Sequence, residues 1–416
     1  MNLQQPPQAE SSYERWGAMC ATAMSDALFY PARGNLPGQS PRVLRITNPP
    51  PSHSLLSKVD NQDQLFSLAF QILEEGVAHR AFPGVSIAVT HLGKLVALKA
   101  LGKFTYDFDS PAVTTETVFD LASVSKVVAT TTVAMLLFDH GLLDLDAPLA
   151  GIVPEFAGED KRRRDVTLRM LLAHSSGLPA YEKLYLRAAT RDALLQETLS
   201  VPLKHDPGVH SEYSDIGFIL LGLALERIAE QTLDRFCQRE IFEPLGMIHT
   251  TYNPPASWKS RIPPTADDQA FRKRIIQGEV QDENASVLDG VAAHAGVFST
   301  ASDLAIFAHA MLRADPFIVR PETVTLFTRS QSSPAGTSQA LGWDTPSTPS
   351  QTGCHFSQSS FGHWGYTGTS LWIDSERQLS VTLLTNRTWP DCSNQAIKEV
   401  RPRFHDAIAE ALGASR

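Results

Sequence analysis

Residues 119–141 read F-D-L-A-S-V-S-K-V-V-A-T-T-T-V-A-M-L-L-F-D-H-G, and the interpretation of the whole chain starts from this stretch. Ser123 precedes Lys126 by three positions, so on a helix the two side chains share one face, with Cβ atoms about 5–6 Å apart. Lys126 is the only lysine with a serine three residues before it. It also stands in an otherwise uncharged stretch, residues 122–138, where a solvated lysine is out of place.

Two interpretations of this pair are open at this point. In the first, Ser123 is a nucleophile and Lys126 accepts its proton, which requires burial or nearby cations to lower the lysine pKa from about 10.4. Backbone N–H groups at the start of the helix would then also stabilise an oxyanion. In the second, Ser123 is only a helix N-cap and Lys126 an ordinary helical residue, because both are common in those positions.

The composition is typical of a soluble globular protein with room for two packed lobes: 416 residues, of which 43% are hydrophobic and 19% charged. The net charge of -9 argues against nucleic-acid binding, which normally needs a basic face. The four cysteines are far apart and form no CxxC pair. We therefore expect neither a disulfide framework nor a cysteine-rich zinc site, and no cofactor.

The first residues, M-N-L-Q-Q-P-P-Q-A-E-S-S-Y-E-R, have neither a basic n-region nor an apolar h-region. No later run looks apolar enough to cross a bilayer. We therefore expect a cytoplasmic protein without a membrane partner; a misassigned start codon would leave a periplasmic location open.

The chain divides by composition into an N-terminal extension and linker, residues 1–60, rich in Pro, Gln and Ser, and a main domain, residues 61–416. Apolar residues at helical spacing predict a helix over 63–79. Two β-branched runs around Leu92-Gly93 predict an antiparallel hairpin. The helix that carries Ser123 should end near Gly141, since glycine suits the left-handed position after a helix.

The middle of the chain, residues 142–284, has mostly helical patterns, and the last part returns to strands before a final helix at about 393–412. We therefore predict an α+β fold with one antiparallel sheet built from both ends of the chain and flanked by helices. This α/β lobe would comprise about 61–141 and 290–416, and a mostly helical lobe about 142–289. A cleft is expected where the lobes join.

Two further motifs carry possible chemistry. In H-S-E-Y-S-D-I-G-F, Tyr213 could move protons, or it could merely pack beside a helix N-cap formed by Ser214 or Asp215. In F-G-H-W-G-Y-T-G-T-S-L-W-I-D, three glycines let a strand edge approach another backbone or a ligand, and His363 adds a donor or a cation. The alternative for the second motif is a glycine-punctuated hairpin with a structural histidine.

The three motifs, in this order, resemble the serine β-lactamase and D-Ala-D-Ala peptidase superfamily, with the class C-like branch that includes the family VIII esterases as the nearest part. The phrases L-L-A-H-S-S-G-L-P, D-G-V-A-A-H-A-G-V-F-S-T-A-S-D-L-A and L-L-T-N-R extend the resemblance over residues 65–412. It implies a β-lactamase/transpeptidase-like fold and an acyl-enzyme mechanism on a small-molecule acyl substrate.

The resemblance also implies roles for particular residues. Ser123 would be the acylated nucleophile, Lys126 its proton partner, and Tyr213 the relay that protonates the leaving group and later activates water. The segment His363-Trp364-Gly365 stands where the family has K-T-G or H-T-G. The oxyanion hole would be formed by the backbone N–H groups of Ser123 and Tyr366.

Two departures from the family pattern bear on the chemistry. Asp215 replaces the usual Asn and could pair with Lys126 and keep it charged, which would move the base role to Tyr213. Trp364 replaces the usual Thr, and His363 the usual Lys, a combination that fits an anionic substrate poorly. Whether Lys126 or Tyr213 is the base stays open.

The sequence thus predicts a serine hydrolase, namely a carboxylesterase on short acyl esters with weak or no β-lactam turnover. The alternatives are a D-amino-acid peptidase, a β-lactamase, or a non-catalytic ligand-binding protein of the same fold. The sequence contains no G-x-S-x-G, H-E-x-x-H or H-x-H motif, which disfavours an α/β-hydrolase and a zinc hydrolase. His174 and His294 are interpreted as structural turn histidines, and no metal site is expected.

Overall fold

The computed structural model describes residues 61–313, 318–331 and 334–413. All of them belong to the second of two units, Met1–Asn48 and Pro49–Arg416, into which the chain divides. The predicted extension, residues 1–60, lies outside the described residues, and the domain boundaries stay a prediction.

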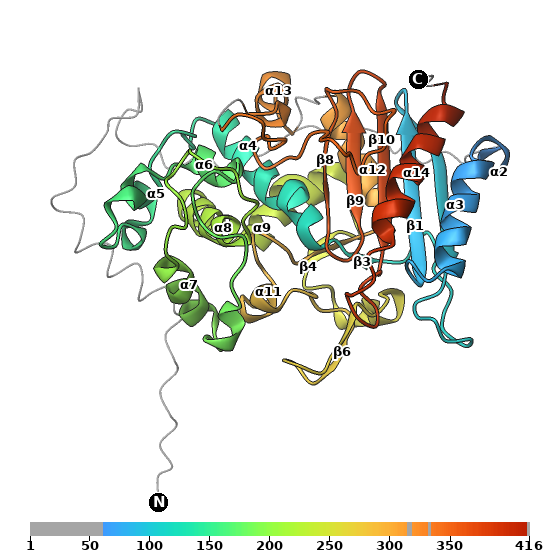
Figure 1. The fold of residues 1–416 in the computed structure, drawn as a ribbon, viewed down its shortest axis with the longest axis horizontal. Coiled ribbons are helices and arrows are strands. Elements are labelled where there is room, and N and C mark those ends of the chain that lie inside the picture. The colour runs from blue at the N-terminus through green and yellow to red at the C-terminus, as the bar shows by residue number, and fades with distance from the viewer. Residues whose placement is uncertain (1–60, 314–317, 332–333, 414–416) are drawn as a thin grey trace, which may run out of the picture. The chain divides into compact units, whose positions relative to one another are not determined.

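The centre of the fold is a five-stranded sheet with the strand order β2-β1-β10-β9-β8, in which all neighbours are antiparallel. Figure 1 shows the first strands, in blue, beside the last strands, in red. The prediction of one antiparallel sheet built from both ends of the chain is confirmed. The strands are β1 (Gly84–His91), β2 (Lys94–Gly102), β8 (Phe361–Trp364), β9 (Ser370–Asp374) and β10 (Leu379–Thr385).

Helices cover both faces of this sheet, as the fold class predicted (Figure 1). On one face α3 (Ser67–Ala78) and α14 (Ile397–Ala411) enclose an apolar cluster that includes Phe70, Trp372 and Phe404. On the other face α12 (Ala301–Arg313) packs against the strands. Because both faces are covered, β1 and β10 are buried nearly from end to end, and this burial includes their serine and threonine residues.

The predicted hairpin is also confirmed. It joins β1 to β2 through Leu92 and Gly93, whose φ angles of 48° and 79° are both in the left-handed region that this tight turn requires. The helix predicted over 63–79 is instead two helices, α2 (Gln62–Leu65) and α3, because the backbone breaks at Phe66. Two of the apolar residues of this stretch, Leu65 and Leu68, are 48% and 54% exposed, so they do not face the core.

The helix that carries Ser123 changes its winding along its length. It begins as a 3-10 turn, η2 (Ala122–Val124), widens into a π-helical segment, η3 (Lys126–Thr131), and continues as α4 (Thr132–Asp139). Gly141 follows with a φ of 69°, as predicted. Contrary to expectation, the span Ala122–Asp139 is long and apolar enough to cross a membrane, but 83% of it is buried inside the fold, as in the core helix of a globular domain.

A second region, mostly helical, lies between β3 (Phe119–Asp120) and β7 (Val297–Ser299). Its long central helix, α8 (Asp215–Ala229), is apolar on most sides and is buried in the core. Short strands β4 (Thr251–Tyr252), β5 (Ala266–Asp268) and β6 (Arg274–Ile276) interrupt the predicted helical stretch, and β4 pairs with β7.

The remaining elements are short. They are α5 (Leu149–Ile152), η4 (Pro154–Phe156), η5 (Lys161–Asp165), α6 (Leu168–Leu172), η6 (Leu184–Leu186), α7 (Arg191–Ser200), α9 (Leu233–Cys237), η7 (Gln238–Phe242), α10 (Glu243–Leu245), η8 (Ala256–Arg261), α11 (Glu283–Val287) and α13 (Pro321–Thr328).

Candidate active site

Ser123 lies at the beginning of its helix and lines a cavity of about 860 Å³. The residue before it, Ala122, has a φ of 46°, a conformation that an L-residue adopts only at a cost. The buried carboxylate of Asp120 holds this backbone in place, because Oδ1 accepts a hydrogen bond of 2.8 Å from the Ala122 amide. The serine is thus presented to the cavity by a strained and anchored turn.

Lys126 is fully buried and its Nζ donates three hydrogen bonds. The acceptors are Ser123 Oγ at 3.0 Å, Asp215 Oδ1 at 2.6 Å and the carbonyl oxygen of His294 at 3.0 Å. Burial lowers the pKa of Lys126, while the charge of Asp215 acts in the opposite direction. The structure therefore has the Lys126–Asp215 pair that the sequence predicted, together with the buried setting that a lysine base needs.

Tyr213 completes the group around the serine, since its hydroxyl donates a hydrogen bond of 2.8 Å to Ser123 Oγ. Burial and the charge of Asp215 raise the pKa of Tyr213 well above 10, so the phenol keeps its proton at neutral pH. The N-cap that the sequence offered as the alternative is also present, because Ser214 Oγ accepts from the Gly217 amide. Tyr213 thus stands beside an N-cap and also contacts the nucleophile.

His174 supports Tyr213 from behind. Its ring contacts the rings of Tyr213 and Phe218, with centroids 4.6 and 5.0 Å away, and Nδ1 accepts from the Ser214 amide. Burial lowers the pKa of His174 well below 6.5, so the ring is neutral. This arrangement is that of the structural turn histidine predicted from the sequence.

The end of β8 packs directly on the backbone that precedes Ser123. A Cβ added to Gly365 would lie 2.4 Å from the Leu121 carbonyl oxygen, a distance that only glycine permits. Thr367 and Thr369 donate hydrogen bonds of 2.8 Å to the carbonyl oxygens of Asp120 and Leu121. These contacts bring the Tyr366 segment to the same cavity as Ser123.

The two amides predicted to form the oxyanion hole are compatible with that role. Within residues 61–313, 318–331 and 334–413, the backbone N–H groups of Ser123 and Tyr366 have no hydrogen-bond partner. A donor without a partner at the cavity is available to a developing oxyanion.

His363 matches the expectation in its charge but not in its position. It is buried, its Nδ1 lies 2.8 Å from the Trp364 carbonyl oxygen, and burial together with the charge of Lys126 lowers its pKa to about 3. The ring is therefore neutral, which agrees with the expectation that a histidine in place of the family's lysine is mostly uncharged at neutral pH. Among the described residues that line the cavity, the segment contributes Trp364, Gly365 and Tyr366 but not His363.

A second carboxylate network adjoins the turn that carries Ser123, and sequence reasoning did not predict it. Asp120 Oδ2 accepts from the Gln281 amide at 2.7 Å, which ties the nucleophile turn to the segment before Asp282. Asp282 Oδ1 in turn accepts from His294 Nε2 at 2.9 Å, and the His294 carbonyl receives Lys126. The A-A-H-A-G phrase contained His294, but its partner is revealed only by the fold.

Two arginines at the cavity were also missed. Arg387, contained in the phrase L-L-T-N-R, donates to the carbonyls of Tyr366 and Cys392, and Arg401 of α14 donates to Gly368. Both are at most 5% exposed. In the part of the chain that the structure describes, no carboxylate forms an ion pair with either guanidinium, and Arg401 Nε has no partner.

The arrangement of Ser123, Lys126 and Tyr213 on this fold agrees with the comparisons. The family model described as Beta-lactamase matches residues 69–400. The chain belongs to the beta-lactamase family. The predicted resemblance is therefore confirmed, and the chain is a serine hydrolase with the fold of that family.

Individual relatives point the same way. The chain is 31% identical over 399 residues to an N-acetylmuramyl-L-alanine amidase of Bacillus subtilis (strain 168), with 86% of each chain covered. It is 32% identical over 344 residues to a protein of Escherichia coli (strain K12) provisionally named a D-alanyl-D-alanine carboxypeptidase, covering 74% of this chain and 79% of that one. Among solved structures, the hydrolase EstCE1 matches with a TM-score of 0.69 and 19% identity over 84% of this chain and 99% of that chain, which supports the fold alone.

Proposed function

We propose that this serine hydrolase cleaves amide bonds next to a carboxylate, as found in N-acylated amino acids and short peptides. The observation that carries the proposal is that Ser123 opens into the same cavity as Arg387 and Arg401. A buried guanidinium is costly unless an anion accompanies it, and a substrate carboxylate would supply that anion. The net charge of -9 does not argue against binding of an anionic substrate, because the electrostatic potential in the cavity depends mainly on the charged groups close to it.

The reaction would begin with proton transfer. The three acceptors around Lys126 Nζ suit an ammonium, and Asp215, 2.6 Å away, is the nearest group that can take a proton from it. The neutral amine then accepts the Ser123 proton across 3.0 Å while Oγ attacks the substrate carbonyl carbon. The amides of Ser123 and Tyr366 stabilise the oxyanion.

Collapse of the tetrahedral intermediate breaks the C–N bond. Tyr213, whose raised pKa keeps its hydroxyl protonated, donates its proton to the leaving amine and recovers one from Lys126. Water then enters, loses one proton to the same pair and adds to the acyl carbon as hydroxide. The proton passes on to Ser123 Oγ as the bond to the acyl group breaks, which restores the serine hydroxyl and releases a carboxylic acid. Lys126 is thus the base in acylation, and Tyr213 is the acid.

Two curated relatives support an amide substrate, because the names amidase and carboxypeptidase both denote cleavage of an amide bond at alanine. The short-chain carboxylesterase predicted from the sequence is the second candidate. It is favoured by the indole of Trp364 in the cavity wall and by the neutral ring of His363. Weak or absent β-lactam turnover is expected in either case.

The nucleophile is tested by intact mass spectrometry after exposure to a fluorophosphonate. One covalent adduct is expected on the natural protein and none on Ser123→Ala. An adduct of equal yield on Ser123→Ala would overturn the role of this serine.

The substrate class is tested with N-acetylmuramyl-L-alanine, an N-acyl-D-Ala-D-Ala peptide, a cephalosporin and p-nitrophenyl butyrate. Arg401→Met should lower kcat/KM on the carboxylate-bearing amides about 10- to 100-fold, the loss expected for a charged hydrogen bond, and leave the neutral ester nearly unchanged. Arg403→Met is the control, since this exposed arginine of the same helix pairs with Glu75. An equal loss on amide and ester, or an ester kcat/KM above that of both amides, would favour the carboxylesterase.

A further inference from the structure

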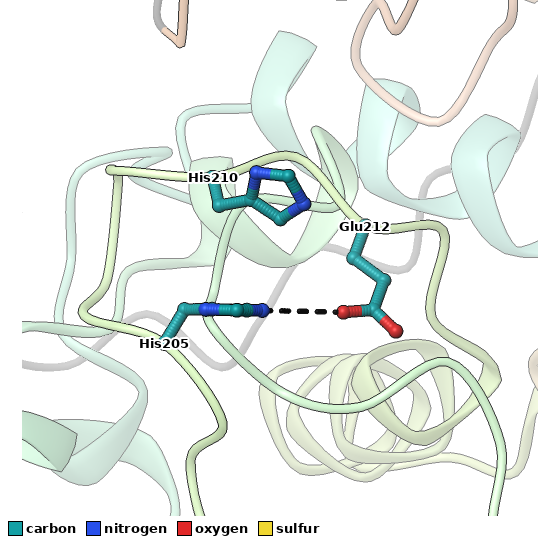
Figure 2. Close-up of side chains that lie close together, drawn as sticks. All are labelled: His205, His210 and Glu212. Carbon is teal, nitrogen blue, oxygen red and sulfur yellow. Dashed lines mark ion pairs between the residues drawn. The ribbon is translucent and has the colours of Figure 1, made fainter.

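A second group of reactive side chains lies on the loop that leads to Tyr213. His205, His210 and Glu212 come from eight consecutive positions, and one ligand-type atom of each lies within 4.8 Å of the others. Figure 2 shows the His205 ring directed edge-on at the Glu212 carboxylate, with the His210 ring beside them. His205 Nε2 is 3.5 Å from Glu212 Oε2, and the two imidazole centroids are 4.8 Å apart. None of the three lines the cavity of Ser123 as far as the described residues define it.

The segment 204–212 that carries this group is hydrogen-bonded at both of its ends to the turn at residues 174–177. The amides of Lys204 and His205 donate to the Gly177 carbonyl at 2.8 and 3.2 Å, and the Glu212 amide donates to the His174 carbonyl at 2.9 Å. The packing is close, because a Cβ on Gly177 would lie 2.2 Å from the His205 carbonyl oxygen. The backbone positions of His205 and Glu212 are therefore held by hydrogen bonds before any ligand binds.

The donor set has a definite chemistry. Imidazole nitrogen and carboxylate oxygen are ligands of zinc, with bonds of about 2.0–2.2 Å, so two ligand atoms of a tetrahedral site lie about 3.4 Å apart. The His205–Glu212 distance already has this value, and His210, which is exposed, can close the remaining gap by rotation.

We propose that His205, His210 and Glu212 form a binding site for zinc or a similar borderline divalent cation, with water as the remaining ligand. Their side chains are partly open to solvent, which leaves room for that water: His205 is 38% and Glu212 24% exposed. Lys204 Nζ lies 3.0 and 3.1 Å from the two Glu212 oxygens and holds the carboxylate when no metal is bound. The ammonium swings away when the cation arrives.

Metal binding would tighten the segment that presents Tyr213. Glu212 directly precedes Tyr213, and its amide donates to the carbonyl oxygen of His174, whose ring packs in a tilted arrangement against the tyrosine ring. A cation that joins positions 205, 210 and 212 therefore restrains the loop without touching the reacting atoms. This site does not depend on the proposed substrate, so either proposal can fail alone.

The test uses the full-length protein without an affinity tag, treated with a chelator and then titrated with ZnCl2 in a calorimeter. All variants carry Cys354→Ser, because Cys354, His355 and Asp406 form a second group of possible ligands. One zinc ion per chain is expected. His205→Ala and His210→Ala should each weaken binding at least about tenfold. Lys204→Met should bind more tightly, since a competing cation is removed, and His140→Ala, at an exposed site, should bind unchanged.

Cobalt absorption bands of a tetrahedral site and a zinc-dependent rise in Tm provide the second readout, and circular dichroism checks that each variant is folded. Both signals should appear in the Cys354→Ser protein and disappear in His205→Ala. Failure of the Cys354→Ser protein to bind zinc, or equal binding by His210→Ala, would overturn the proposal. Weaker binding by Lys204→Met would also count against it, because it would mean that the lysine stabilises the site.

Discussion

Lys126 Nζ lies 2.6 Å from Asp215 Oδ1, closer than the 3.0 Å that separates the same nitrogen from Ser123 Oγ. A carboxylate that can only accept when ionised thus stands where the family pattern has an amide, and it changes both proton carriers. Its charge opposes the lowering of the Lys126 pKa by burial and adds to the raising of the Tyr213 pKa. Burial outweighs the Asp215 charge at Lys126, so the pKa of Lys126 is lowered on balance while that of Tyr213 is raised. These net directions favour Lys126 as the base and Tyr213 as the acid.

Asp215→Asn is expected to move the acidic limb of the pH profile. Removing the negative charge lets burial lower the pKa of Lys126 further, so the neutral amine forms at lower pH. The limb of kcat/KM for p-nitrophenyl butyrate, measured from pH 5 to 9, should shift downward by about 1–3 units, the usual effect of a close opposite charge. Asp192→Asn, at an exposed position, should leave the limb in place. An upward shift would exclude Lys126 as the base.

Tyr213→Phe separates leaving groups by their need for a proton. An amine must be protonated to leave, whereas p-nitrophenolate departs as an anion. We expect kcat/KM on an amide to fall by about 10²–10⁴, the range for a lost general acid, and on the p-nitrophenyl ester to fall far less. Tyr185→Phe lines the same cavity and should lose little on either. Equal losses on both substrates would mean that Tyr213 acts in the attack of Ser123 on the carbonyl carbon and not in protonation of the leaving group.

Much of the fold was predictable because each element buries its own apolar residues. The β1–β2 hairpin depends on two left-handed positions at Leu92-Gly93, and the Ser123 motif is a local pattern, so both are visible in a short window. The break at Phe66 was not, because phenylalanine carries no helix-ending signal and the backbone turns there to bury its ring.

The parts of the site that sequence reasoning missed are joined across long stretches of chain. Asp120 meets the Gln281 amide 161 positions away, and Lys126 meets the His294 carbonyl across 168. Arg401 looks like an ordinary charged residue of an amphipathic final helix, and only the packing of α14 against the β8–β9 turn buries it. Spacing along the sequence contains none of this information.

Asp120 should make stability depend on pH. Burial raises its pKa from 3.8 to about 6, so between these values the folded protein binds a proton that the unfolded chain does not. As the pH falls through this window, the group therefore adds stability, up to about 3 kcal/mol for a shift of about two units. Asp120→Asn lacks this pH-dependent contribution, because an amide does not titrate in this range. The free energy of unfolding of the natural protein, minus that of the variant, should rise between pH 7.5 and 4.5 in urea titrations, and a constant difference would contradict the prediction.

Gly365→Ala tests whether the contact between the end of β8 and the nucleophile turn positions the site. The new Cβ would lie 2.2 Å from Thr369 Oγ1 and 2.4 Å from the Leu121 carbonyl oxygen, and the second atom belongs to the backbone and cannot rotate away. The strand must therefore move, and the Tyr366 amide with it, which should lower kcat at least about 10²-fold, as the loss of one oxyanion donor does.

Gly151→Ala is the matched control, because its Cβ meets no atom within 4 Å. Gly151 lies in the helix α5, so Gly151→Ala should keep full activity. Its free energy of unfolding, measured by thermal unfolding, should rise by up to about 1 kcal/mol. If Gly365→Ala kept its activity as well, the amide of Tyr366 would not be an oxyanion donor.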